Sequence, residues 1–135
     1  MSSEPATILI IDDEPQNRRL LEALLQPEGY RTLSAATGDE AMALIEQHPP
    51  DLVLLDIMMP GMDGFEVASR IKANPATATI PIIMVTAQDG RGARMIGLNS
   101  GVEEFLTKPV DRAELWLRVR NLLRLKASAD ALQDP

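Results

Sequence analysis

Five short apolar runs alternate along the chain with segments in which apolar residues recur every three or four positions. The runs cover residues 7–11, 30–35, 51–56, 80–86 and 103–107. A short apolar run between turn residues is typical of a strand that is buried on both faces of a parallel sheet. The segments between the runs have the period of helices that turn one face to a core.

Four of the predicted helices begin with a capping pattern, in which an Asp or Thr precedes an acid or an amide by three positions. The exception is the segment 90–101, where four glycines surround and interrupt a helical pattern. Each interior glycine costs about 1 kcal/mol of helix stability relative to alanine, so we expect this helix to be weakly held. The four capping pairs are Asp13 with Gln16, Thr37 with Glu40, Asp63 with Glu66, and Asp111 with Glu114.

The alternation of strand and helix predicts an α/β fold with a doubly wound, five-stranded parallel sheet. Right-handed crossovers place helices on both faces of such a sheet. We favour the strand order 2-1-3-4-5, in which the direction of winding reverses between strands 1 and 3. One domain is expected at residues 7–126, with a tail at 1–6 and a tail or linker stub at 127–135.

Composition narrows the possible functions of the 135-residue chain. The net charge of −7 disfavours direct binding of nucleic acid, which needs a basic surface. The absence of cysteine excludes disulfides, thiolate metal sites and a cysteine nucleophile. No apolar run is long enough to span a membrane and the first residues do not resemble a signal peptide, so we expect a cytoplasmic protein without membrane contact.

Polar side chains follow four of the five predicted strands. Asp12 and Asp13 follow the first, Asp56 ends the third, Thr86 ends the fourth, and Lys108 follows the fifth. The carboxyl ends of parallel strands meet at one edge of the sheet, so these side chains should lie together. Three close carboxylates repel one another, and bound Mg²⁺ would relieve that repulsion. Asp56 could then act as a nucleophile toward a phosphoryl group, with Lys108 and Thr86 contacting the phosphoryl oxygens.

This combination resembles the response-regulator receiver domain of two-component signalling, over residues 7–126. The motifs are the acidic pair, Asp-Ile-Met-Met-Pro-Gly-Met-Asp-Gly from Asp56, Thr-Ala from Thr86, and Lys-Pro from Lys108. The resemblance implies a flavodoxin-like fold and a switch that accepts a phosphoryl group from a histidine kinase or a phosphotransfer protein. Such a switch catalyses only its own phosphorylation and dephosphorylation.

The resemblance also implies a role for each matching residue. Asp56 is the phosphoacceptor, Thr86 the switch hydroxyl and Lys108 the phosphate-binding lysine. Phe105, three residues before Lys108, matches the switch aromatic residue. Met58 and Gln88 match positions that tune autodephosphorylation. The implied Mg²⁺ ligands are Asp13, Asp56 and the backbone carbonyl of Met58, with Asp12 acting mainly through water.

A narrower resemblance concerns the output of the switch. The stretches 87–92, 105–109 and 118–120 are similar to receivers attached to cyclic-di-GMP enzymes. We expect phosphorylation to change the surface made by the fourth helix, the fifth strand and the last helix, and so to control a homodimer or an output partner. The chain is then either a stand-alone receiver or part of a longer regulator.

Simpler structural roles compete with several of these interpretations. Asp13 alone would be a helix cap, and its position beside Asp12 is what favours metal binding. Phe105 could be a partly buried core residue as well as a switch. His48, the only histidine, is expected to be exposed and not to donate phosphate. Trp116 and Leu123 predict an exposed apolar pair, which is a modest indication of a partner surface.

Three other function classes fit the sequence less well. A Mg²⁺-dependent phosphatase with an aspartyl nucleophile needs an acid two residues after the nucleophile, where this chain has Met58. A pseudo-receiver would lack one of the acidic residues or the lysine, and none is missing. A flavodoxin-like cofactor binder would need a phosphate-binding loop and aromatic stacking groups, and this sequence lacks both.

Overall fold

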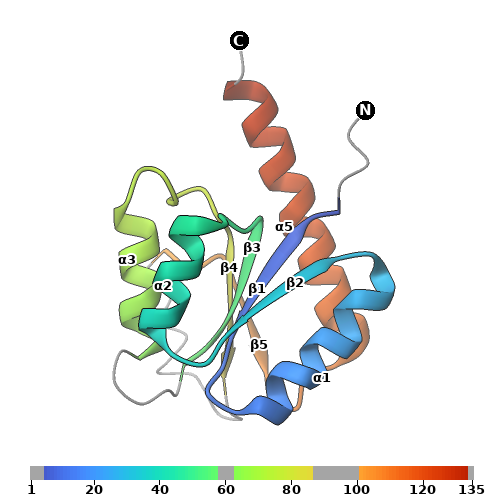
Figure 1. The fold of residues 1–135 in the computed structure, drawn as a ribbon. Coiled ribbons are helices and arrows are strands. Elements are labelled where there is room, and N and C mark those ends of the chain that lie inside the picture. The colour runs from blue at the N-terminus through green and yellow to red at the C-terminus, as the bar shows by residue number, and fades with distance from the viewer. Residues whose placement is uncertain (1–4, 58–62, 87–100, 134–135) are drawn as a thin grey trace.

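The sheet has the predicted strand number, direction and order. The computed structural model of the protein describes residues 5–57, 63–86 and 101–133, with side chains as far as residue 129. All neighbouring strands are parallel, and their order is β2-β1-β3-β4-β5 (Figure 1). The strands are β1 (Thr7–Ile11), β2 (Arg31–Ala35), β3 (Leu52–Asp56), β4 (Ile82–Thr86) and β5 (Glu104–Thr107).

Helices cover both faces of this sheet, as the alternating pattern predicted (Figure 1). One face packs β1 and β3 residues against α1 and α5, with Leu25, Leu115 and Val119 fully buried. The other face packs against α2 and α3, with Ala41 and Ile71 fully buried. The helices are α1 (Pro15–Leu25), α2 (Gly38–Gln47), α3 (Gly64–Ala73) and α5 (Arg112–Gln133), and a 3₁₀ turn, η1 (Gln26–Glu28), follows α1. The helix predicted within 90–101 lies outside the described residues.

Burial is most complete in the middle of the sheet. All five residues of β3 and all five of β4 are buried, including the polar residues Asp56 and Thr86 at their carboxyl ends. The edge strand β2 is less covered, and Arg31 at its start is exposed. The two strands that carry the predicted acceptor and hydroxyl are therefore fixed by packing on both faces.

Three of the four predicted helix caps are confirmed. Thr37 Oγ1 accepts a hydrogen bond from Glu40 N at 3.1 Å, Asp63 Oδ1 accepts from Glu66 N at 2.9 Å, and Asp111 Oδ2 accepts from Glu114 N at 2.9 Å. The fourth prediction is wrong. The residue before α1 is Glu14, which makes no side-chain cap, and Pro15 opens the helix. Asp13 therefore lies outside the helix and does not cap it.

The last helix is long, and its packing corrects one prediction. It continues through Gln133, so residues 127–133 of the predicted tail or linker are helical and extend past the sheet (Figure 1). The expected exposed pair on this helix is wrong. Trp116 is half-buried and its Nε1 donates to the carbonyl of Leu24 on α1 at 2.8 Å, while Leu123 packs against the core. No described helix combines the length and the apolar character needed to cross a bilayer.

Candidate functional site

Three carboxylates converge where β1 and β3 end. Asp12 and Asp13 follow β1, Asp56 ends β3, and one carboxylate oxygen from each lies within 4.8 Å of the others. Asp12 is 2% exposed and Asp56 5% exposed, while Asp13 is half-buried. Oxygen ligands at this spacing suit a hard divalent cation. The sequence prediction that these residues meet is confirmed, and together they could hold a metal ion.

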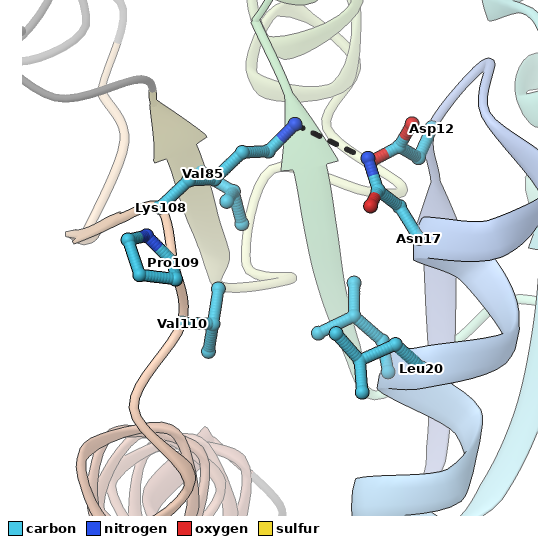
Figure 2. Close-up of a pocket in the computed structure, with 8 residues that line it drawn as sticks. Asp12, Asn17, Leu20, Val85, Lys108, Pro109 and Val110 are labelled. Carbon is cyan, nitrogen blue, oxygen red and sulfur yellow. Dashed lines mark ion pairs between the residues drawn. The ribbon is translucent and has the colours of Figure 1, made fainter.

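One lysine balances part of this negative charge. Lys108 Nζ lies 3.4 Å from Asp56 Oδ1 and 3.7 Å from Asp12 Oδ2. Its side chain crosses from the loop after β5 toward the end of β1 (Figure 2). The backbone of Lys108 is held by its N–H, which donates to the carbonyl of Thr86 at 2.7 Å, and the Lys108–Pro109 peptide bond is cis. With three carboxylates and one ammonium group, the site keeps an excess of negative charge that attracts a cation.

Asp56 is held in place by close packing against the start of α3. Gly64 N donates to the carbonyl of Ile57 at 3.1 Å. A Cβ atom at Gly64 would lie 2.6 Å from the backbone oxygen of Asp56 and 2.8 Å from the Cα of Ile57. Only glycine lets the first turn of α3 approach the end of β3 this closely. The sequence did not single out Gly64 for this role, since a glycine after a Pro/Gly-rich loop is expected for the turn alone.

Thr86 and Phe105 lie on the neighbouring strands β4 and β5. Thr86, 3% exposed, ends β4 and pairs in register with Thr107. Phe105 is partly buried against the core cluster that includes α2 and α3 residues, and it pairs with Met84. The sequence allowed a core role for Phe105, and this packing confirms that part. Met58 and Gln88, the other two positions singled out, lie outside the described residues.

Residues of α1 that the sequence did not assign to the site also border it. Arg18 Nη1 donates to the backbone oxygen of Asp12 at 2.6 Å. Asn17 Nδ2 donates to Glu14 Oε2 at 3.3 Å, and Asn17 lines a cavity next to Asp12 and Lys108 (Figure 2). Both side chains come from the first turn of α1. Only their closeness to Asp12 in the sequence indicated this role. A side chain in the first turn of a helix can reach back to the end of the preceding strand.

A small cavity of about 180 Å³ opens beside the carboxylates, between α1 and the loop after β5. Leu20 and Leu21 line it from α1, and Pro109 and Val110 line it from the opposite side (Figure 2). Leu20 is 53% exposed. The approach to the acidic cluster therefore has apolar walls on the side of α1.

Comparison with known proteins agrees with this geometry. The family model for the response regulator receiver domain matches residues 8–120. The response regulator PleD of Caulobacter vibrioides is 49% identical over 128 residues, which are 95% of this chain and 28% of that protein. Protein PilH of Pseudomonas aeruginosa is 38% identical over 118 residues, 87% of this chain and 98% of that protein. This chain thus spans less than a third of PleD and nearly all of PilH.

Solved structures support the same assignment. The crystal structure of a putative response regulator from Chloroflexus aurantiacus matches with a TM-score of 0.87 and 38% identity, covering 89% of this chain and 98% of that one. The region that the family model matches, residues 8–120, includes β1 from Ile8, the other four strands, the acidic cluster and Lys108. The chain therefore belongs to the response regulator receiver domain family, and a receiver domain is a phosphoacceptor rather than a catalytic enzyme.

Proposed function

We propose that this protein is a phosphorylation switch in which Asp56 accepts a phosphoryl group from the phosphohistidine of a histidine kinase or phosphotransfer protein. One observation carries the proposal. A carboxylate that is 5% exposed lies with two others at a strand end, with an ammonium group 3.4 Å from its Oδ1 atom. A buried carboxylate beside an ammonium group is suited to nucleophilic attack on phosphorus.

The proposed metal is Mg²⁺, held by Asp13, Asp56 and the backbone carbonyl of Met58, with Asp12 acting through water. The three-carboxylate cluster supports this assignment, because its oxygens are hard ligands and the ion pairs of Lys108 with Asp12 and Asp56 offset only part of their charge. Bound Mg²⁺ would offset the charge of the incoming phosphoryl group. Asp12 Oδ2 faces Lys108, and Asp12 Oδ1 accepts a hydrogen bond from Glu14 N at 2.9 Å, so the orientation of this carboxylate is fixed.

In the proposed transfer, an Asp56 oxygen forms a bond to phosphorus while the phosphorus–nitrogen bond of phosphohistidine breaks. The electron pair of that bond returns to the imidazole, which leaves with the donor. Lys108 moves from its 3.4 Å contact with Asp56 Oδ1 to a phosphoryl oxygen, since the new group carries more charge than the carboxylate. The Thr86 hydroxyl donates to another phosphoryl oxygen.

The response to phosphorylation begins at Thr86 in this proposal. When its side chain turns toward the phosphoryl group, it leaves space that Phe105 on the adjacent strand can occupy. Because Phe105 packs against the core cluster on the face of α2 and α3, its movement would shift β5, the edge strand that leads into α5, and so the surface around that edge. That surface, with the helix expected within 90–101, would control a homodimer or an output partner. The resemblance to receivers of cyclic-di-GMP enzymes, with 49% identity to PleD, favours such an enzyme as the output.

The experiment that tests the acceptor is intact mass after incubation with Mg²⁺ and acetyl phosphate. We expect a mass gain equal to one phosphoryl group in the wild type and none in Asp56→Asn. Asp51→Asn is the matched control, because Asp51 is a carboxylate directly before the same strand, at the end opposite Asp56. A gain in Asp56→Asn would assign the phosphoryl group to another residue. No gain in the wild type, with Mg²⁺ binding shown, would favour the pseudo-receiver.

The switch step has its own test. Thr86→Ala should still gain a phosphoryl group, because the nucleophile and the acidic cluster are intact, but it should no longer couple phosphorylation to dimerisation. Sedimentation equilibrium with and without acetyl phosphate measures that coupling, with Thr107→Ala on the neighbouring strand as the control. Full coupling in Thr86→Ala would remove the hydroxyl from the mechanism.

A further inference from the structure

Arg18 reaches from the first turn of α1 back to the peptide group that joins Asp12 and Asp13. Its Nη1 donates to the backbone oxygen of Asp12 at 2.6 Å, and Arg18 is half-buried. A short hydrogen bond from a charged donor is about twice as strong as a neutral one. This bond fixes the plane of a peptide that lies between two of the three carboxylates.

The same short stretch is held from three other directions at Asp12. Its N–H donates to the carbonyl of Ala35 on β2 at 3.1 Å, its Oδ1 accepts from Glu14 N at 2.9 Å, and its Oδ2 faces Lys108 at 3.7 Å. Asp13 is different: among the described residues, its side chain has no hydrogen bond or ion pair. The direction of the Asp13 carboxylate therefore depends on the backbone before it, which Arg18 fixes.

The positive charge of Arg18 alone would weaken the binding of a divalent cation at the carboxylates. A guanidinium group close to a divalent cation repels it, so a purely electrostatic role would make Mg²⁺ bind more weakly in the wild type than without Arg18. A role in orienting a ligand would make Mg²⁺ bind more tightly in the wild type. The sign of the change on substitution therefore separates the two roles.

We infer that Arg18 is a positioning residue for the divalent cation: by holding the Asp12–Asp13 peptide, it keeps the Asp13 carboxylate aimed at the metal site. This inference rests on the proposed Mg²⁺ site. Loss of a group that orients a metal ligand commonly costs about 10–100-fold in affinity. Arg18 does not touch the ion or the phosphoryl group, and it acts only through the backbone of Asp12 and Asp13.

The test is the Mg²⁺ dissociation constant of the unphosphorylated protein, measured by isothermal titration calorimetry. Arg18→Gln should raise the constant roughly tenfold. Arg18→Lys, which keeps a charged donor, should stay within about threefold of the wild type. Arg19→Gln is the matched control, because Arg19 is the adjacent exposed arginine and its loss changes the net charge equally. We expect its constant to be unchanged or slightly lower.

A second measurement uses the wild type alone, in case Arg18→Gln does not fold. Hydrogen exchange of the Arg18 guanidinium, followed by NMR, should slow on Mg²⁺ addition, because the ion rigidifies the peptide to which Arg18 is bonded. Exchange at Arg19 should not change. Unchanged exchange at Arg18, or an Arg18→Gln variant that binds Mg²⁺ as well as the wild type or better, overturns the positioning role. A wild type that binds no Mg²⁺ overturns the proposed metal site as well.

Discussion

The two ends of the sheet each hold a partly buried lysine, and the surroundings of the two lysines differ. Lys72, on α3, lies at the end where β4 and β5 begin. Its Nζ donates to the carbonyls of Ala78 and Ile80 at 3.1 and 2.7 Å, and to Glu103 Oε2 at 2.7 Å. The other oxygen of Glu103 accepts from Ile82 N at 2.8 Å. Three donors of an ammonium group thus meet three acceptors.

Lys108, at the opposite end, has a different balance of charge. Its Nζ lies 3.4 Å from Asp56 and 3.7 Å from Asp12, and a third carboxylate, Asp13, lies close by. Its side chain is 34% exposed, compared with 14% for Lys72. The contacts of Lys108 are longer than those of Lys72, and the three carboxylates around it carry more negative charge than its ammonium group offsets. We infer that the Lys72 end is built for stability, and that the Lys108 end keeps charge available for a cation and a phosphoryl group.

The largest expected effect on stability comes from Lys72→Met. It leaves Glu103 without its cation and two carbonyls without their donor, which should lower the free energy of unfolding by about 2–3 kcal/mol. Urea unfolding followed by circular dichroism measures the change. Arg70→Met is the control, because it removes an exposed i,i+4 pair with Glu66 and should cost less than about 0.5 kcal/mol. Equal losses in the two variants would contradict the structural role of Lys72.

Much of the acceptor end could be predicted from the sequence, and the reason is geometric. Once the strands are recognised as parallel, their carboxyl ends must share an edge, so Asp12, Asp56 and Lys108 meet whatever the helices do. The central strands β3 and β4 were recognisable for a second reason: a fully buried strand has a short continuous apolar run, which a helix rarely has. The fold and the acidic cluster follow from these two regularities.

The remaining contacts depend on how each helix is rotated and placed on the sheet. An apolar stripe fixes that rotation only to within about one residue, so Trp116 turns toward α1 although an exposed position was expected. The contact between Lys72 and Glu103 joins residues 31 positions apart, and no periodicity relates them. Arg18 could not be assigned for the same reason, because its reach to Asp12 depends on where α1 begins.

Asp56→Asn should change the free energy of unfolding less than Lys72→Met does, and in the opposite direction, in the absence of metal. Removing one of three close carboxylates relieves repulsion in the folded state, which should raise the free energy of unfolding by about 1 kcal/mol in EDTA. Thermal unfolding measures the change, and Mg²⁺ should then stabilise the variant less than the wild type. Asp51→Asn is the control: Asp51 Oδ2 accepts from Thr7 N at 2.7 Å, and the neutral amide is a weaker acceptor, so this variant should be less stable. Destabilisation by Asp56→Asn would mean that the cluster does not carry excess charge.

The smallest expected change in stability is that of Lys108→Met, although its functional effect should be large. Its two ion pairs are long and its side chain is a third exposed, so solvent screens them and the free energy of unfolding should change by less than about 1 kcal/mol. Removing this cation should make Mg²⁺ bind roughly threefold more tightly, because one positive charge no longer competes for the carboxylates. The variant should still gain a phosphoryl group from acetyl phosphate but should not undergo the dimerisation that phosphorylation drives. Calorimetry, intact mass and sedimentation measure these outcomes, with Lys108→Arg as the variant that keeps the charge. If Lys108→Met destabilises the fold as much as Lys72→Met, then both lysines are structural and the contrast between the two ends of the sheet does not hold.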